Sequence, residues 1–139
     1  MSDQQVLYGD EHVRRYRETN GEEGFIWREG SQILLLTTTG RRSGEQTTTP
    51  LIFGMDGDNP VIVASKGGAP EHPGWYRNLV KNPAAHVQIK GEKFPVRARD
   101  AEGEERERLW KMMNGEWRHY EEYQEKTDRQ IPVVILERG

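Results

Sequence analysis

The sequence predicts a mainly β fold with helices around it, an antiparallel barrel that is either closed or split, built as one domain of residues 1–139. Three observations predict this class. Runs rich in β-branched and apolar residues recur along the chain and are separated by turns that contain glycine, proline and asparagine. Pairs of these runs are joined by connections short enough for hairpins, which favours antiparallel pairing. The regular strand-and-helix alternation of a parallel dinucleotide-binding fold is missing, because the strands follow one another as a meander.

The first 30 residues are expected to form a helical extension in front of the barrel. Spaced apolar and charged residues over His12–Arg17 predict a short helix, which ends near the turn residues Asn20 and Gly21. The first hairpin is predicted from Gln32–Thr39 and Thr47–Met55, because the seven residues between these strands include two glycines.

The remaining elements are predicted from turn chemistry and periodicity. Pro73 suits the first residue of a helix, and Asn82-Pro83 ends that helix. Apolar and polar residues alternate on both sides of Gly91, as in the half-buried strands of a second hairpin. The expected elements are, in chain order, strand Val61–Ser65, helix Pro73–Lys81, strands Ala85–Lys90 and Phe94–Asp100, helix Glu102–Met113, a helix with Trp117, Tyr120 and Tyr123 along one side, and strand Ile131–Leu136.

Composition and charge exclude several classes of function. Twenty Lys and Arg against 23 Asp and Glu give a net charge of -3, which argues against nucleic acid or an anionic membrane as a general partner. The chain has no cysteine, and its four histidines lack metal-ligand spacing, so no metal site is expected. The N-terminus carries no signal peptide, and the most apolar run, Ile33–Leu36, is far shorter than the ~20 residues of a membrane span, so a cytoplasmic protein is expected. With 33% apolar residues and a mean hydropathy of -0.94, the core is expected to be thin, and a bound cofactor to add stability.

The turn Gly40-Arg41-Arg42-Ser43-Gly44, at the tip of the first hairpin, is the first feature with a chemical interpretation. Its glycines leave backbone amides free to form an anion-binding nest. The planar guanidinium groups suit phosphate because they donate paired hydrogen bonds and keep their charge. Taken alone, the pattern fits an ordinary solvated turn equally well.

Neighbouring features extend this turn into a possible cofactor groove. Thr37–Thr39 and Thr47–Thr49 place hydroxyl groups on adjacent strands, and Pro50 marks a bulge or an open edge that offers a flat shelf for a ring. The loop Ala64–Gly68 carries glycines and a lysine, and the helix from Pro73 presents N-terminal amides that favour an anion. Each feature also has a structural interpretation, since β-propensity explains the threonines and capping explains the helix end.

Aromatic residues admit two interpretations. Trp117, Tyr120 and Tyr123 either form a lid above a flat cofactor, with a phenolic hydroxyl near the substrate, or pack in the core, which is the more common use of this spacing. Trp75 is more often a core anchor, whereas the adjacent polar residues Arg77 and Asn78 are harder to explain by packing.

A set of ordered motifs over nearly all of the chain after residue 30 resembles a known family. The motifs are Leu36–Gly44, Thr49–Leu51, Ala64–Gly68, Pro73–Leu79, Asn82-Pro83, Ala98–Asp100, Glu104–Arg106 and Thr127–Pro132. Together they resemble the deazaflavin-dependent nitroreductase family. The resemblance implies a split β-barrel of the FMN-binding, pyridoxamine-phosphate-oxidase-like type, which binds coenzyme F420 and uses its reduced form as a hydride donor toward quinones and, in some members, nitroaromatic compounds.

The resemblance also implies roles for individual residues. Arg41, Arg42 and Ser43 are expected to hold the phosphate of the cofactor. The other residues expected at the cofactor are Thr47, Thr48, Thr49, Pro50, Leu51, Ile52, Val63, Ala64, Ser65, Lys66, Gly74, Trp75, Tyr76, Arg77, Asn78 and Tyr120. Trp117, Tyr120 and Tyr123 are expected at the acceptor substrate, with Ser65 and Tyr120 as the catalytic residues that hydrogen-bond the reacting system.

Two departures from the family pattern refine these expectations. Glu45, Gln46 and Thr47 stand where members can carry a further basic residue, which predicts weaker binding of the phosphate. Trp117 stands where relatives can carry tyrosine, which favours reduction of quinones over reduction of nitro groups.

Several alternatives stay open on the sequence alone. One is a split barrel that binds flavin mononucleotide or haem, and another is an F420 carrier or sensor without catalysis. A nucleic-acid module is disfavoured, because the basic residues form no stripe with interleaved aromatics. The sequence allows a monomer or a homodimer, and Val6–Arg17 is expected to help a transient contact with a membrane surface if the acceptor is a lipid-soluble quinone.

Overall fold

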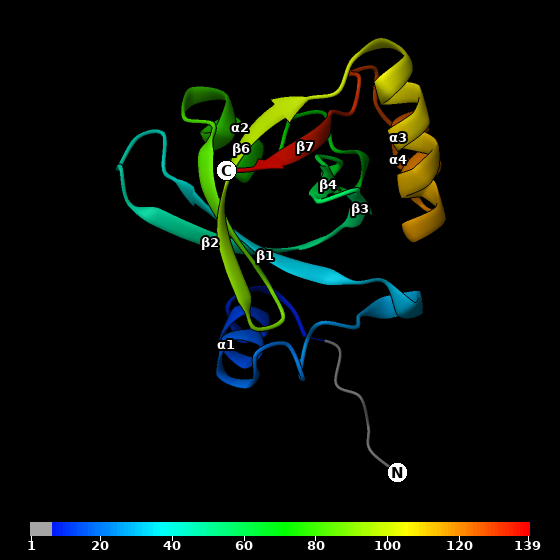
Figure 1. Cartoon of the computed structure of the whole chain (residues 1–139). Helices are drawn as coiled ribbons and strands as arrows, with labels where there is room; N and C mark the ends of the chain where they lie inside the picture. The colour runs from blue at the N-terminus through cyan, green and yellow to red at the C-terminus, as the bar shows by residue number, and fades with distance from the viewer. Residues whose placement is uncertain (1–6) are drawn as a thin grey trace.

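The structure, a computed structural model that describes residues 7–139, contains one seven-stranded antiparallel sheet in the order β2-β1-β5-β6-β7-β4-β3, which curls on itself (Figure 1). The strands are β1 (Ile33–Thr39), β2 (Gln46–Ile52), β3 (Gly54–Asp56), β4 (Asn59–Val63), β5 (Ala84–Ile89), β6 (Glu92–Asp100) and β7 (Val133–Arg138). The helices are α1 (Gly9–Thr19), α2 (Gly74–Lys81), α3 (Gly103–Glu116) and α4 (Tyr120–Glu125), with short 3-10 turns η1 (Arg28–Gly30) and η2 (Lys66–Gly68).

The curl of the sheet follows from its connectivity. Strands β2 and β3 form its two edges, yet Phe53 alone separates them in the sequence. Phe53 is buried, and its backbone N–H donates to the carbonyl of Gln32 (3.1 Å). The expected single strand Thr47–Met55 is therefore wrong, because the chain leaves β1 at Phe53 and pairs next with β4. The predicted split antiparallel barrel is confirmed.

The register of β1 with β2 runs without interruption from Ile33 opposite Ile52 to Thr39 opposite Gln46. Pro50, opposite Leu35, lies within this register on the edge strand of the sheet. Of the two structures expected at Pro50, the open edge is therefore present and the bulge is not. An edge strand tolerates proline because one side of its backbone has no ladder partner.

Two apolar layers bury the sheet. The barrel interior contains Leu34, Leu36, Val87 and Leu136, while α1 covers the outer side of β1 at Ile33 and Leu35. All four residues Ile33–Leu36 are consequently at most 2% exposed, which explains why β1 is continuously apolar rather than alternating.

Helices α3 and α4 cover the opposite part of the barrel, as Figure 1 shows beside β7, β4 and β3. Leu109 and Met113 of α3 pack against Val61 and Ile135 in this layer. The expected helix with three aligned aromatics differs in its start. Trp117 is the C-cap of α3, and α4 begins only at Tyr120. None of the helices in residues 7–139 is long and apolar enough to cross a membrane.

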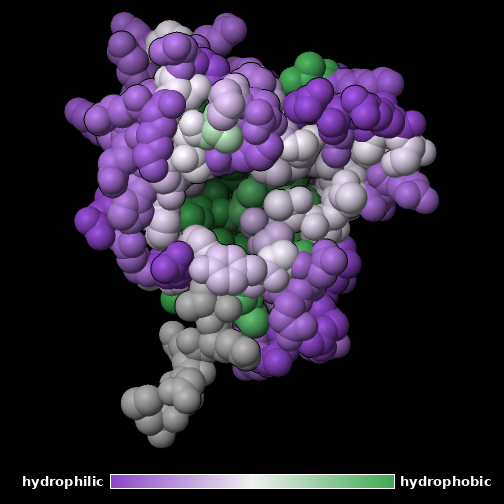
Figure 2. Space-filling view, turned by 180° about the vertical axis from the view of Figure 1, so that it is seen from behind, coloured by the Kyte–Doolittle hydropathy of each residue, from purple (hydrophilic) through white to green (hydrophobic). Residues whose placement is uncertain are grey.

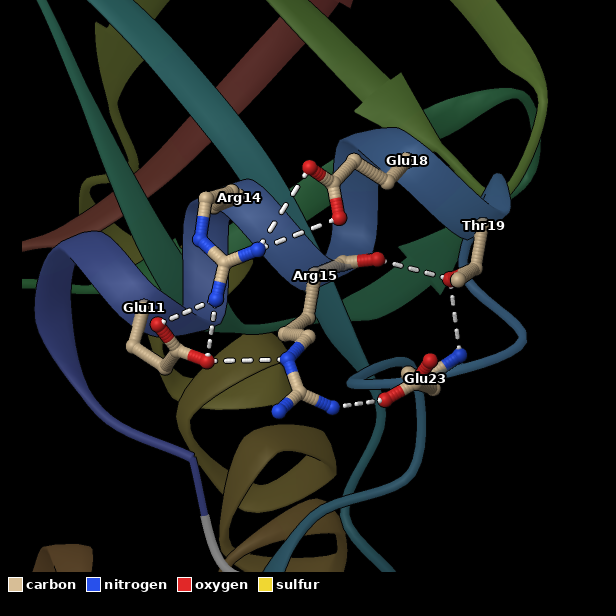
Figure 3. A network of polar contacts seen from close by, with 6 residues as sticks. All are labelled: Glu11, Arg14, Arg15, Glu18, Thr19 and Glu23. Carbon is tan, nitrogen blue, oxygen red and sulfur yellow. Dashed lines mark hydrogen bonds and ion pairs between the residues drawn. The ribbon is translucent and has the colours of Figure 1, made fainter.

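Charged side chains of α1 pair with one another on the exposed side of the helix (Figure 3). Arg14 contacts Glu11 (2.6 Å) and Glu18 (3.2 Å), and Arg15 contacts Glu11 (2.8 Å) and Glu23 (2.6 Å). Such exposed pairs contribute little to stability. They do neutralise the arginines, so this side of α1 is not a basic face.

Candidate functional site

A cavity of about 430 Å³ opens beside the edge strand β2, and the space-filling view shows a hollow with an apolar floor (Figure 2). Its volume falls within the roughly 300–1,000 Å³ of small-molecule sites. The walls come from segments far apart in the sequence. The lining residues are Leu7, Tyr8, Gly9, His12, Trp27, Ile33, Thr49, Pro50, Leu51, Ile52, Val63, Ser65, Lys66, Gly67, Pro73, Trp75, Trp117, Tyr120 and Tyr123.

The charged end of the site, which we define as Arg41, Arg42 and Arg77, lies beside the start of α2. The backbone N–H and Nη1 of Arg41 both donate to Oδ1 of Asn78 (3.1 and 3.0 Å), and Nη1 also donates to the carbonyl of Gly74 (3.4 Å). Nδ2 of Asn78, a residue 7% exposed, donates to Oγ1 of Thr38 (3.0 Å). Asn78 therefore fixes the turn against α2, and Gly74 connects it to the cavity wall at Pro73 and Trp75.

Positive charge at this end is not neutralised within the described chain. Desolvation lowers the pKa of Arg41, and the nearby charges of Arg77 and Arg42 lower it further. Among residues 7–139, none of these three arginines forms an ion pair with a carboxylate. Clustered arginines of this kind favour an anionic ligand.

The turn differs from the expected amide nest. The N–H of Gly40 donates to the carbonyl of Glu45 (2.7 Å), that of Gly44 to the carbonyl of Gly40 (2.9 Å), and that of Glu45 to Oγ of Ser43 (3.1 Å). These amides are used to close the turn itself. The capacity for an anion therefore lies mainly in the guanidinium groups.

The aromatic end of the site, which we define as Trp27, Trp117, Tyr120 and Tyr123, closes the cavity opposite α2. The rings of Trp27 and Trp117 lie 5.6 Å apart and those of Tyr120 and Tyr123 lie 6.2 Å apart. Trp117 Nε1 donates to the hydroxyl of Tyr123 (3.3 Å), and Trp27 Nε1 donates to the carbonyl of Leu7 (3.0 Å). Trp117 and Tyr120 pack in the core layer under α3 and also line the cavity, so the core interpretation is confirmed and the lid above a cofactor stays a prediction.

The hydroxyl of Tyr120 is the polar group available at this end. Tyr120 is 4% exposed, and within residues 7–139 its hydroxyl has no hydrogen-bond partner. It is not sealed inside the protein, since no buried side-chain polar atom of the described chain lacks a partner. Burial raises the pKa of Tyr120, followed by the effects of Tyr123 and Glu116, so the phenol stays protonated. It can therefore donate a hydrogen bond to a ligand.

The cavity brings together most of the expected contact residues but not all of them. Those that line it are Thr49, Pro50, Leu51, Ile52, Val63, Ser65, Lys66, Trp75, Trp117, Tyr120 and Tyr123. Arg41, Arg42, Ser43, Gly74, Arg77 and Asn78 belong to the turn and to α2 at the charged end or beside it. Lys66 directs its ammonium to Glu71 (3.1 Å) on the surface.

Four expected cofactor residues lie away from the cavity. Ala64 is buried in the barrel core, and Tyr76 donates its hydroxyl to Asp100 (2.6 Å). Thr48 bonds to Thr37 (2.8 Å) across the hairpin, and Thr47 is exposed near the start of β2. Some of the threonine hydroxyls expected to line a polar groove therefore bond to one another instead.

Sequence reasoning missed one wall of the cavity. Leu7, Tyr8, Gly9, His12 and Trp27 line it from the N-terminal segment, α1 and the residue before η1. His12 is 2% exposed, and its Nε2 bonds to the carbonyl of Gly24 (2.7 Å). The one local signal is the short apolar run Phe25-Ile26-Trp27, which has neither strand nor helix periodicity and therefore indicates a tertiary contact.

Fold and site together define a cofactor-binding split barrel with an aromatic cavity and an arginine-rich turn. The chain belongs to the F420H(2)-dependent quinone reductase family, whose sequence model matches residues 8–138. It is 41% identical over 130 residues to an F420H(2)-dependent quinone reductase of Mycobacterium tuberculosis, covering 91% of this chain and 87% of that protein.

Solved structures agree with this assignment. An F420-H2 dependent reductase superposes with a TM-score of 0.71 at 47% identity, over 76% of this chain and 93% of that one. A chain described as a domain-swapped dimer superposes at 0.74 with 42% identity, over 90% and 96% of the two chains. A pyridoxamine 5'-phosphate oxidase-like protein of Listeria innocua, at 15% identity over 76% and 82% of the chains and a TM-score of 0.53, shares the fold alone.

Proposed function

We propose that this protein transfers a hydride from reduced coenzyme F420 to a quinone. The observation that carries the proposal is the continuity between an un-neutralised arginine cluster and an apolar, aromatic cavity. The cluster suits the phosphate of F420, and the cavity suits flat rings. When bound, reduced F420 supplies the hydride donor that none of the side chains in the cavity can supply.

We expect three groups of residues to contact this cofactor. Arg41 and Arg42, with Ser43 and Arg77 beside them, bind the phosphate. Residues Thr49–Ile52 of the edge strand form one side for the ring system and Val63, Ser65 and Lys66 form the other, while the segment Gly74–Asn78, apart from Tyr76, contacts the remainder. Within this last segment, Trp75 lines the cavity and is therefore the residue that we expect to contact the cofactor directly.

The aromatic end orients the acceptor and excludes water. Trp117 and Tyr123 present ring faces to a planar quinone, and the Tyr120 hydroxyl donates a hydrogen bond to its carbonyl oxygen, where negative charge develops as the hydride arrives. Ser65 lines the cavity from the other wall and offers a second hydroxyl. Because burial raises the pKa of Tyr120, the phenol remains a donor, and water supplies the proton that completes the hydroquinone.

Purified protein mixed anaerobically with reduced F420 and menadione tests this function. The expected result is a protein-dependent return of the absorbance of oxidised F420, with saturation in both reactants. Tight F420 binding without turnover would replace the proposal by a carrier or sensor. A yellow or red protein as isolated would replace it by a flavin or haem protein.

Nitroaromatic compounds, partner copies and membranes are secondary parts of the proposal. We infer that a nitroaromatic compound enters the same cavity but is reduced more slowly than a quinone, which parallel assays would measure.

A homodimer would use the open edges of β2 and β3, as light scattering would detect. We place the protein in the cytoplasm, with transient membrane contact through the exposed Tyr8, in the segment expected to make it, and through the exposed Ile26, since Arg14 and Arg15 of α1 are already paired with glutamates. Co-sedimentation with vesicles tests that contact.

A further inference from the structure

Arg129, in the segment between α4 and β7, makes four hydrogen bonds to the segment 64–72. Its Nε donates to the carbonyl of Ala69 (2.9 Å) and its Nη2 to the carbonyl of Ser65 (2.8 Å). Its Nη1 donates to the carbonyl of Ala64 (3.2 Å) and to Nδ1 of His72 (2.9 Å). One guanidinium therefore ties together the whole connection between β4 and α2.

This connection forms a wall of the cavity through Ser65, Lys66 and Gly67. Its backbone is unusual, because Lys66, Gly67 and Gly68 all have positive φ (45°, 63° and 86°). A lysine in the left-handed region costs about 1–2 kcal/mol and persists only where surrounding contacts hold it. The Arg129 bonds to the carbonyls of Ala64 and Ser65, immediately before this stretch, are such contacts.

We propose that Arg129 is a positioning residue that holds Ser65 and Lys66 in the shape that binds F420. Arg129 does not line the cavity itself, so its effect is transmitted through the segment 64–69. This inference rests on the proposed function, because it assigns a determinant of the same cofactor site.

His72 makes this arrangement sensitive to pH. A guanidinium only donates, so Nδ1 of His72 must be an unprotonated acceptor. Burial lowers the pKa of His72, Arg129 and Arg77 lower it further and Asp100 opposes them, while the ring of Tyr76 lies 4.8 Å away. A lowered pKa in the folded state means that the contribution of His72 is present above its ordinary value of 6.5 and is lost as the pH falls through the folded value.

The test is a fluorescence titration of F420 with Arg129→Ala, alone and with added methylguanidinium. We expect the dissociation constant to rise about tenfold and the added cation to restore much of the affinity. Arg106→Ala is the matched control, because Arg106 is also partly buried and donates to a backbone carbonyl, that of Ile131 (2.7 Å), without contacting residues 64–72. This control is expected to lose stability but to keep F420 affinity.

The outcomes separate the inference from the function it rests on. Wild-type protein that binds no F420 would overturn the proposed function. Wild-type binding with unchanged affinity in Arg129→Ala, or an equal loss in Arg106→Ala without rescue, would overturn the positioning role.

If Arg129→Ala does not fold, His72→Gln decides the matter. The glutamine carbonyl can accept from Arg129 without titrating, so F420 affinity should fall less below pH 6.5 than in the wild type. Identical pH profiles of the two proteins would overturn the inference.

Discussion

The charged end of the site is made by one short turn and the helix beside it, whereas the aromatic end is assembled from segments more than 90 residues apart, between Trp27 and Tyr123. At the charged end, Asn78 of α2 holds the turn by bonds to Thr38 and Arg41, and Lys81 of the same helix donates to the carbonyl of Arg41 (2.8 Å). At the aromatic end, rings from three segments support one another. The difference suggests that anion binding depends on one local contact between the turn and α2, whereas the shape of the acceptor cavity depends on the whole fold.

The largest effect, on F420 affinity, is expected when the charged end is disrupted. Changing Arg41 and Arg42 together to alanine removes two charge-assisted contacts, each worth about 1.5–3 kcal/mol. The dissociation constant of F420 should therefore rise at least about 100-fold in a fluorescence titration. The double variant Arg97→Ala with Lys111→Ala, both at exposed positions elsewhere, removes the same charge and should leave affinity unchanged. Equal affinity in the first variant would mean that the phosphate binds elsewhere.

The turn at this end could be predicted from the sequence because Arg41 and Arg42 are adjacent and glycines flank them, whereas the approach of Arg77 depends on the packing of α2. The use of its amides could not be predicted, since the bonds from Gly40 and Gly44 depend on how the turn closes. The strands could also be predicted, because runs of β-branched and apolar residues between turn residues are local signals. The break between β2 and β3 at Phe53 could not. That break exists only because the sheet curls until β3 joins β4 at the opposite edge.

A second, smaller effect concerns chemistry at the aromatic end. Tyr120→Phe removes the hydroxyl and keeps the ring that packs in the core, so kcat should fall roughly 10- to 100-fold, with a smaller change in F420 affinity. Tyr123→Phe is the comparison, because its hydroxyl already accepts from Trp117 and should matter less. Steady-state kinetics with reduced F420 and menadione measures both. Equal losses in the two variants would contradict the special role of Tyr120.

The aromatic end shows why half of the site escaped prediction. Trp117, Tyr120 and Tyr123 were visible as a spacing, but Trp27 and His12 reach the cavity only through tertiary packing. Trp27 contacts Trp117 and Tyr8, at sequence separations that no periodicity encodes. Local pattern predicts which side chains are apolar, and the curled sheet decides which of them face a ligand.

A third prediction tests the packing contact between η2, which follows Ser65, and α4. A Cβ added at Gly68 would lie 2.6 Å from the carbonyl oxygen of Tyr123, whereas one at Gly67 would meet nothing within 4 Å. Both glycines have positive φ, so Gly67→Ala controls for backbone strain. Gly68→Ala should lower the free energy of unfolding by about 2 kcal/mol more than Gly67→Ala, as urea denaturation would measure. Equal stabilities would show that α4 can shift at little cost.

The smallest effect concerns the rim of the aromatic end. His119 contacts Glu29 through Nε2 (2.8 Å) and Glu122 through Nδ1 (2.9 Å), which requires a protonated ring, and its ring lies 4.7 Å from that of Trp117. These two bonds raise the pKa of His119, although burial and, less strongly, Arg118 oppose them.

The sign of the pH effect follows from that shift. A pKa raised in the folded state gives stability that is complete below the ordinary value of 6.5 and is lost as the pH rises through the folded value. An NMR titration should therefore place His119 above 6.5, and Glu29→Gln should lower its midpoint, whereas Glu22→Gln, at an exposed position in the same region, should not. The near-UV signal of Trp27 and Trp117 should weaken as the pH rises through the midpoint of His119, while F420 affinity at the arginine cluster stays constant because guanidinium groups keep their charge there. A parallel loss of both would mean that the two ends are coupled, and that the acceptor cavity and the phosphate site open as one unit.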